Sequence, residues 1–373
     1  MKLTPMVLPY QRIKALARGQ RPAIRSTSRL NERQFQPASL DCTLGRRVYR
    51  VASSFLPRES ETIAELLKTR TLYDFDLKPG SILEINTPYI IPLNESLALP
   101  GSLDARANPK SSIGRIDVFV RVLTDHNPQY DYITPGYKGP LYLEVIPLTF
   151  AIRVAPGLAM TQVRFRSTDD RFPTEAEMVV THKKFGLITD NHGQPVPRRA
   201  LRLKDNVISF SVDLTGSPIV AYRARHYVSE LLDLTKRNHY HEDHFWTPVR
   251  RQPDGEIMLE PNSFYIMATK ERVRIPPTMA AEIMPYDPST GELRSHYAGF
   301  FDPGFGYSVR GKRGNIVVLE VRAHSAPFRL TDGQVICKML FEKMAELPAK
   351  LYGSNIGSTY TSARIRLSKF FKR

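Results

Sequence analysis

The sequence predicts a mainly β protein that is made of two related β domains and a few short helices. Two parts of the chain align at a constant offset, because Glu95 and Phe165 correspond to Glu271 and Phe341, and 271 − 95 = 341 − 165 = 176. Further pairs at this offset are Pro100 with Pro276, Pro109 with Pro285, Glu144 with Glu320, and Gly157 with Gly333. A fixed period in a chain of 373 residues indicates a duplicated domain. The 29 prolines argue against long helices.

The first half begins with a predicted short amphipathic helix over 7–18 and an alternating strand over 38–50. Residues 60–68 predict a second helix with Ser60 as its N-cap. From residue 80 onward, short β-rich segments punctuated by Gly and Pro predict a sandwich, a jelly roll or a distorted barrel. These segments lie at 81–93, 117–123, 141–154 and 160–166.

The second half repeats this scheme after a polar and charged segment at 166–205, where we place the domain junction. Its strand-forming segments lie at 207–214 and 219–234, and they are followed by the aligned block, which runs from 256–277 to 335–344. The predicted domains are therefore residues 1–175 and 176–345. Residues 346–373 form a basic C-terminal arm, which we expect to be mobile and to become ordered on a ligand.

Charge and cysteine content limit the class of partner. The chain has 53 Lys and Arg against 37 Asp and Glu, a formal net charge of +16, which attracts nucleic acid, anionic lipid or nucleoside phosphates. The two cysteines, Cys42 and Cys337, form no CxxC motif, so neither a disulfide framework nor a cysteine zinc site is expected. No apolar run approaches membrane-spanning length and no signal peptide is evident, so we expect a cytoplasmic protein without a membrane partner.

The first candidate for a ligand site is the segment KSSIGR at 110–115. Lys110 and Arg115 flank Ser111 and Ser112, so two cations and two hydroxyl groups lie within six residues. Such donors suit a phosphate or an oxyanion. A solvated turn is the alternative, because Ser and Gly are common turn residues.

The second candidate is a pair of glutamates, Glu144 and Glu320, each inside a strongly apolar strand. A carboxylate flanked by Leu and Val is partly desolvated, which raises its pKa and makes it a candidate general base. The alternative is an outward-facing Glu on a half-exposed strand. Recurrence at the same register in both halves favours the first interpretation.

The third candidate is the segment AGFFDPG at 298–304. Ala298 and Gly299 would let a backbone approach a ligand closely, Asp302 offers a carboxylate in a turn, and Phe305 offers a ring face. A plain loop turn with core aromatic residues is the alternative.

A histidine cluster at 238–246 is a possible metal site. His239, His241 and His244 do not have the spacing of the helical HExxH motif, and no cysteine is near them. We therefore favour a surface hairpin for this segment.

Together these residues resemble the deoxycytidine triphosphate deaminase family of the trimeric dUTPase-like superfamily, in its long, duplicated form. KSSIGR resembles the family's RSS-x-x-R segment, with Lys110 in place of the first Arg, and AGFFDPG matches its Ala-x-x-x-Asp-Pro-Gly segment. The Leu-Glu pairs that end in Glu144 and Glu320 match the family's strand motif, and SLDCTLG at 39–45 matches its Ser/Ala-x-Asp-x-x-Leu-Gly segment. The resemblance implies two tandem dUTPase-like distorted jelly-roll or β-clip domains.

The resemblance also implies an activity, the zinc-independent hydrolysis of dCTP to dUTP and ammonia. In the family, the Glu is the general base for a water that attacks C4 of cytosine, and the motif Ser and Arg position this water. The Ala carbonyl group helps to fix the water, the Asp-Pro-Gly turn contacts the deoxyribose, and Mg²⁺ accompanies the triphosphate. The chain also lacks the HxE and PCxxC motifs of zinc-dependent deaminases.

Neither half matches the family's pattern completely. The second half has Tyr286, Asp287 and Gly291 at the positions of Lys110, Ser111 and Arg115. The first half instead has Tyr130 and Thr134 at the positions of Ala298 and Asp302.

Because active sites in the family's trimers lie between subunits, we expect a composite site. One part is Lys110, Ser111, Ser112 and Arg115, and the other is Ala298, Asp302 and Glu320. Glu144 is then the second choice for the base, and otherwise a remnant or a structural partner for Arg115.

The C-terminal arm departs from the family as well. It keeps Tyr360 of a Tyr-Gln-x-Gln-like stretch that closes over phosphates in the family, but it lacks the glutamines. Arg364, Arg366 or Lys369 could neutralise phosphate instead.

Two other functions fit parts of the sequence. A dUTP diphosphatase, or an enzyme that carries out both steps, would direct water to the α-phosphate, although no Gly-rich C-terminal motif is evident. A basic β protein could also bind single-stranded nucleic acid. Its basic residues are scattered apart from the arm, so we do not expect nucleic acid as a partner. We expect a nucleotide ligand and a homo-oligomer, either a trimer or another ring.

Overall fold

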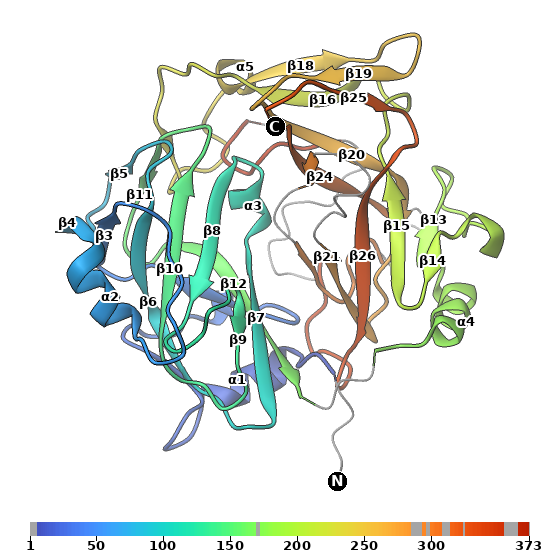
Figure 1. Cartoon of the computed structure of the whole chain (residues 1–373). Helices are drawn as coiled ribbons and strands as arrows, with labels where there is room; N and C mark the ends of the chain where they lie inside the picture. Colours follow the sequence, from blue (N-terminus) through green and yellow to red (C-terminus); the bar gives the residue numbers. More distant parts are fainter. Residues whose placement is uncertain are drawn as a thin grey trace. The chain divides into compact units, whose positions relative to one another are not determined.

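The computed structural model describes residues 6–168, 172–284, 293–295, 299–307, 314–323, 325–353 and 365–372, and for 293–295 it describes the backbone alone. Strands dominate these residues and the helices are short, as the sequence predicts (Figure 1). The chain divides into two compact units. Unit 1 comprises 1–171, 229–239 and 345–349, and unit 2 comprises 172–228, 240–344 and 350–373.

Unit 1 contains three sheets. The largest has the strand order β4-β3-β6-β10-β8, with β1 paired to β6. The second has the order β2-β12-β7-β9, and the third has the order β17-β11-β5. The strands of the largest sheet are β1 (Ile24–Ser26), β3 (Arg47–Val51), β4 (Thr71–Asp76), β6 (Tyr89–Ala98), β8 (Val118–Leu123) and β10 (Lys138–Pro147). Those of the other two are β2 (Leu40–Thr43), β7 (Leu103–Pro109), β9 (Tyr132–Ile133), β12 (Ala159–Ser167), β5 (Ser81–Leu83), β11 (Ile152–Val154) and β17 (Leu232–Asp233).

Unit 2 repeats this arrangement of sheets. Its strand orders are β18-β16-β20-β24-β22 with β13 on β20, β14-β15-β26-β21-β23, and β19-β25. The strands of the first sheet are β13 (Ile188–Thr189), β16 (Ile219–Ala224), β18 (Trp246–Arg250), β20 (Phe264–Val273), β22 (Leu293–Ser295) and β24 (Asn315–Ala323). The others are β14 (Leu203–Lys204), β15 (Val207–Ser211), β21 (Met279–Met284), β23 (Phe300–Phe301), β26 (Val335–Lys343), β19 (Glu256–Leu259) and β25 (Phe328–Thr331).

The duplication is visible in the strand register. Glu144 of β10 lies opposite Ile90 of β6, and Glu320 of β24 lies opposite Ile266 of β20, so 320 − 144 = 266 − 90 = 176. Strands β12 and β26 also begin at this offset, since 335 − 159 = 176. The period found in the sequence is therefore a period of the fold.

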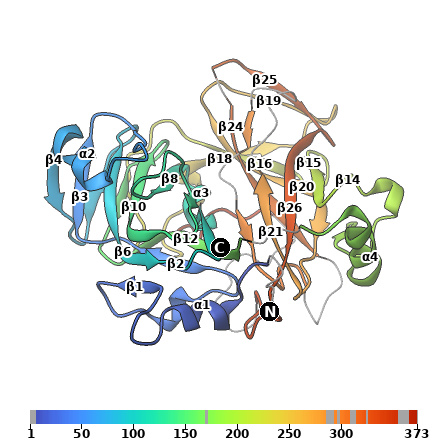
Figure 2. The ribbon, with the colours of Figure 1, turned by 60° about the horizontal axis from the view of Figure 1, so that its bottom comes forward.

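The helices of unit 1 are α1 (Tyr10–Leu16), α2 (Ile63–Arg70), α3 (Ser111–Gly114) and the 3-10 helix η1 (Glu32–Gln34). Helix α2 lies beside β3 (Figures 1 and 2), and it buries Ile63, Leu66 and Leu67 in a cluster with Val51, Ile90 and Leu123. Its N-cap is Thr62, not the predicted Ser60, because the Thr62 side chain accepts the Glu65 N–H in a capping box.

The helices of unit 2 are α4 (Glu175–Phe185), α5 (Glu242–Phe245) and the 3-10 helix η2 (Arg198–Ala200). Helix α4 lies inside the segment that was predicted as the polar junction. The core of unit 2 is formed by Phe210, Met267, Leu319, Phe341 and other buried apolar residues of both large sheets.

Candidate functional site

The KSSIGR segment lies in unit 1, where β7 ends and the short helix α3 begins. The Lys110 N–H donates to the Met160 carbonyl of β12 at 3.0 Å, which fixes the start of the segment against the sheet. Ser112 and Arg115 are buried, at 4% and 7% exposure, whereas Ser111 and Lys110 are partly exposed. The segment is thus a packed corner of the fold rather than a solvated turn.

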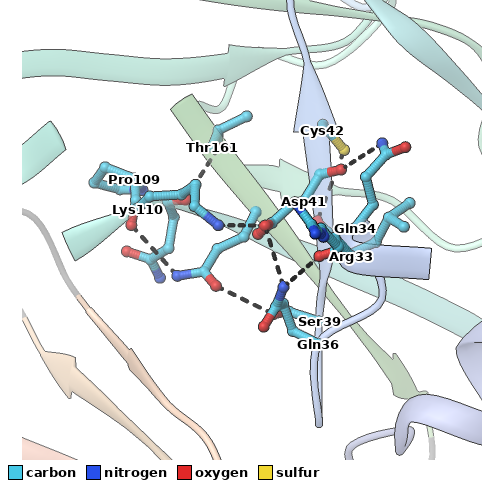
Figure 3. A network of polar contacts seen from close by, with 12 residues as sticks. Arg33, Gln34, Gln36, Ser39, Asp41, Cys42, Pro109, Lys110 and Thr161 are labelled. Atoms are coloured by element: carbon cyan, nitrogen blue, oxygen red, sulfur yellow. Dashed lines mark hydrogen bonds and ion pairs between the residues drawn. The ribbon is translucent and has the colours of Figure 1, made fainter. Parts of the chain in front are cut away.

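A polar network connects this segment to β2 (Figure 3). The Lys110 ammonium group forms an ion pair with the Asp41 carboxylate, which also accepts from Gln36 Nε2 at 3.3 Å. Gln162 lies opposite Asp41 on β12, accepts from Ser39 Oγ at 3.1 Å and donates to the Pro109 carbonyl at 3.4 Å. The SLDCTLG and KSSIGR motifs, which are about 70 residues apart in the sequence, are therefore parts of one network.

A second buried carboxylate, that of Glu95, forms hydrogen bonds with β2. Glu95 accepts the Thr43 N–H at 2.7 Å, the Thr43 hydroxyl at 2.9 Å and Gln34 Nε2 at 2.8 Å. Burial raises the pKa of Glu95, although these hydrogen bonds act in the opposite direction. Unit 2 has the equivalent link, because Glu271 accepts the Ser211 N–H at 2.8 Å and the Ser211 hydroxyl at 2.7 Å.

Glu144 is completely buried, at 0% exposure. Neither of its carboxyl oxygens has a hydrogen-bond partner among the described residues. The hydroxyls of Ser54 and Tyr130 and the Arg121 guanidinium lie nearby, but burial has the largest effect and raises the pKa of Glu144. Tyr130 donates instead to the Phe55 carbonyl at 3.2 Å. Tyr130 is the residue that stands in this half where the second half has Ala298, and its side chain lies close to Glu144.

Glu320 differs from Glu144 in access to solvent. It occupies the same register on β24, but its side chain is partly exposed. Of the two predicted general bases, Glu320 is therefore the one whose side chain is more exposed to solvent.

The Asp-Pro-Gly turn of unit 2 directly follows β23. The Phe305 N–H donates to the Asp302 carbonyl at 3.1 Å and the Tyr352 N–H donates to the Pro303 carbonyl at 2.8 Å. Gly304 has φ +93°, and a Cβ there would lie 3.0 Å from Leu351 Cβ and from Tyr352 N, so the turn requires glycine. Asp302 is partly exposed, and Gly299 accepts the Ile283 N–H at 3.2 Å.

Of three other predicted site residues, one lies in the core of unit 2 and two lie outside the described residues. Phe305 is 8% exposed and belongs to the core of unit 2, with its ring 5.0 Å from Phe301 and 5.1 Å from Tyr352, as in the core alternative. Ala298 and Tyr360 lie outside the described residues, as do Tyr286, Asp287, Gly291 and Arg364.

The end of the predicted arm is packed against unit 2. Phe370 and Phe371 are buried, and the Lys372 N–H donates to the Tyr240 carbonyl at 2.8 Å. The Phe371 ring contacts Phe245 and Trp246 at 5.4 and 6.0 Å between centroids. Lys369, a predicted phosphate ligand, has its ammonium group 5.4 Å from the Phe370 ring. In this structure residues 365–372 of the predicted arm are therefore in contact with unit 2, and its mobility stays a prediction.

The histidine segment does not form the predicted hairpin. His241 precedes the short helix α5, His244 lies on it, and β18 follows, with both side chains exposed. Among the residues that the structure describes, no group of three or more His, Cys, Asp or Glu side chains is placed to bind a metal ion. In the same residues, no helix has the length and apolar character needed to cross a membrane.

The sequence alone does not indicate the roles of Asp41 and Tyr130. It places Asp41 in a motif without a partner and does not single out Gln36 or Gln162. The signal for Asp41 was its position, because an acidic residue between Leu40 and Cys42 in a buried strand requires a compensating cation.

Comparison with known families gives matches over both halves of the chain. The model of the 2'-deoxycytidine 5'-triphosphate deaminase N-terminal domain matches residues 4–169, and that of the C-terminal domain matches residues 174–371.

Individual relatives agree with this result. A crystal structure of 2'-deoxycytidine 5'-triphosphate deaminase from Agrobacterium tumefaciens is 40% identical and superposes with a TM-score of 0.84, covering 92% of this chain and 99% of that one. A dUMP-forming dCTP deaminase of Methanobrevibacter smithii is 28% identical over 159 residues, which is 41% of this chain and 75% of the relative. A dCTP deaminase of Halorubrum lacusprofundi is 32% identical over 114 residues, 30% of this chain and 52% of the relative. Since the two family models together span nearly the whole chain, the protein belongs to the 2'-deoxycytidine 5'-triphosphate deaminase family.

Proposed function

We propose that this protein hydrolyses dCTP to dUTP and ammonia without zinc, with Glu320 as the general base. The match of both family domains, in order along the chain, carries the choice of reaction. The difference in exposure between Glu320 and Glu144 carries the choice of base.

In this proposal the Glu320 carboxylate takes a proton from a water molecule as that water attacks C4 of cytosine. The proton then moves to the departing amino group, which leaves as ammonia, and the second proton of the water ends on N3 of the uracil as its C4 carbonyl forms. A partly exposed carboxylate suits this role, since it is accessible to solvent. Glu144 is the second choice for this role, because its carboxyl group is completely buried.

The remaining roles follow the family's motifs. Ser111 and Arg115 position the water and the base, while Lys110 and Ser112 donate to phosphate oxygens. The Ala298 carbonyl fixes the water, and Gly299 and Asp302 contact the sugar. Tyr360 and Lys369 are proposed phosphate contacts, and Phe305 supports the base pocket from the core. The two sets of residues form a composite site between domains or subunits, in a homo-oligomer that is a trimer or another ring.

Mg²⁺ enters this proposal as part of the substrate. Triphosphate oxygens are hard ligands that suit this ion, and in nucleotide enzymes it retains several waters. Lys110, Ser112 and Lys369 would then complement the charge that Mg²⁺ leaves uncompensated.

Substitution of the two glutamates tests the assignment of the base. Glu320→Gln removes the proton acceptor and keeps the shape of the side chain, so kcat for dCTP should fall by about 10²-fold or more. Glu144→Gln, the matched control at the equivalent strand position, should retain most of the activity. Release of ammonia from dCTP measures both. The opposite pattern would rule out Glu320 as the base and the composite site with it.

A second function follows from the names of the relatives. The matched proteins from M. smithii and Coprothermobacter proteolyticus are dUMP-forming dCTP deaminases. An enzyme of this kind also hydrolyses the bond between the α- and β-phosphates, which yields pyrophosphate. Incubation of the pure protein with dCTP, and separately with dUTP, distinguishes these functions. Release of ammonia from dCTP without pyrophosphate indicates a deaminase, and release of both from dCTP indicates both steps. Release of pyrophosphate from dUTP, with no ammonia from dCTP, indicates a diphosphatase.

A further inference from the structure

We propose that Asp41 is a positioning residue that holds the Lys110 ammonium group where it binds the phosphates of the substrate. This inference rests on the proposed function, because it assigns Lys110 to the nucleotide phosphates. It adds a residue of β2 to the site.

The contacts of Asp41 carry the inference. The side chain is buried, at 6% exposure, and one carboxylate oxygen, Oδ2, pairs with Lys110 Nζ and accepts from Gln36 Nε2 at 3.3 Å (Figure 3). The other oxygen, Oδ1, has no hydrogen-bond partner in the described part of the chain. A buried carboxylate requires a compensating cation. Lys110 is the cation that the ion pair provides.

Asp41 is itself held rigidly. Its carbonyl accepts from Gln34 Nε2 at 3.0 Å, and the next residue but one, Thr43, is tied to Glu95. On the other side, β2 is paired with β12, which places Gln162 directly opposite Asp41. The carboxylate is therefore a fixed point on a sheet, which is the kind of support that positions a binding residue accurately.

Lys110 needs such support. A lysine ammonium group sits at the end of a flexible chain of four carbons, and this side chain carries about 2 kcal/mol of rotamer entropy. An unsupported ammonium group therefore samples many positions. The ammonium group has three N–H donors, and the bond to Asp41 uses one of them. Lys110 remains 22% exposed at its side chain, so its other donors can reach a ligand at the start of α3. The ion pair thus fixes the position of the cation while leaving donors for a phosphate.

Binding of inorganic tripolyphosphate to the full chain, measured by calorimetry, tests this role without a need for turnover. Asp41→Asn keeps the size of the side chain but removes its charge, and we expect the Kd for tripolyphosphate to rise about tenfold or more. With dCTP, KM should rise while kcat changes little. Asp332→Asn is the matched control, because it removes the charge from the Lys270–Asp332 ion pair of unit 2 and should leave both values unchanged.

A double-substitution cycle separates positioning from a merely structural role. If Asp41 acts through Lys110, then Asp41→Asn has no further effect on the tripolyphosphate Kd in a Lys110→Gln background. If Asp41→Asn does not fold alone, the comparison of Lys110→Gln with the double variant, in which both members of the buried pair are neutral, still decides. Equal Kd values support the inference, and a Kd that is further weakened in the double variant overturns it.

The outcomes also separate this inference from the proposed function. A wild-type protein that binds tripolyphosphate through Asp41 and Lys110 but releases no ammonia from dCTP would refute the deaminase function and support the positioning role. A protein that deaminates dCTP with the same KM and the same tripolyphosphate Kd after Asp41→Asn would refute the positioning role alone.

Discussion

Glu144 and Glu320 occupy the same strand position in the two units, but Glu144 is completely buried whereas Glu320 is partly exposed. The Glu144 carboxyl group lies near Tyr130, is completely buried and has no hydrogen-bond partner among the described residues. The sequence alone left the choice between them open because the flanking residues, Leu and Val, are nearly the same in both strands. The nearby Tyr130 lies 14 positions away in the sequence and reaches Glu144 only in the folded chain.

Replacement of this glutamate should stabilise the protein in a pH-dependent way. Burial raises the pKa of Glu144 above its ordinary value of 4.5, so the folded state binds more protons than the unfolded state just above that pH. The free energy of unfolding should therefore fall as the pH rises from about 4.5 through the folded-state pKa. Glu144→Gln removes this loss, and we expect the variant to gain about 1 kcal/mol over wild type at pH 8 and less at pH 4.5.

Denaturant unfolding of both proteins between pH 4.5 and 8 measures the effect. Glu95 also has a raised pKa, so part of the pH dependence should remain in the variant. A difference between the two proteins that does not change with pH would contradict the assignment of a buried, charged Glu144.

At the scale of elements, strands were predicted more reliably than helix boundaries. Alternating and apolar segments bounded by Gly and Pro located many strands of both units, although β4 and β7 lie outside the predicted segments. Helix α4 was missed, although Thr174 and Glu177 form a capping box and Gly186 ends the helix in the left-handed conformation. Its charged surface, with residues such as Lys183 and Lys184 in the last turn, made the segment resemble a linker.

The N-terminus of α2 offers a test of capping. Thr62→Ala removes the side chain that accepts the Glu65 N–H and should cost about 1 kcal/mol of stability. Ser60→Ala, at the residue that the sequence predicted as the cap, should change stability by less than about 0.5 kcal/mol. Urea unfolding midpoints measure both variants. A larger loss for Ser60→Ala would favour the boundary predicted from the sequence.

At the scale of the whole molecule, the duplication was predictable and the exact composition of each unit was not. A constant offset between identical residues is a direct sign of a repeated domain, and the strand orders repeat accordingly. The sequence gives no sign that residues 229–239 and 345–349 belong to unit 1, because such short segments carry little pattern of their own. The composite site remains a prediction for the same reason: it depends on an arrangement of domains or subunits that motifs do not encode.

Because residues 229–239 and 345–349 belong to unit 1, the stability of the first half should depend on the rest of the chain. Strand β17 pairs with β11 in unit 1, the Ala345 N–H donates to the Val7 carbonyl at 3.0 Å, and Arg12 forms an ion pair with Glu346 at 3.0 Å. A fragment of residues 1–175 lacks all three contacts. We expect its thermal unfolding midpoint to lie several degrees below that of the full chain, as circular dichroism can measure. Equal midpoints would show that the two segments contribute little to unit 1.

The link from Glu95 to Thr43 and its counterpart from Glu271 to Ser211 place two versions of one carboxylate contact in a single polypeptide. Such a pair can serve as matched spectroscopic probes. Isotope labelling of both glutamates would let infrared bands of the two carboxyl groups be compared in the same sample, at the same temperature and salt concentration. Any difference in frequency between the two bands would then report a difference between the surroundings of the two carboxyl groups. Variation between separate preparations would not contribute to it.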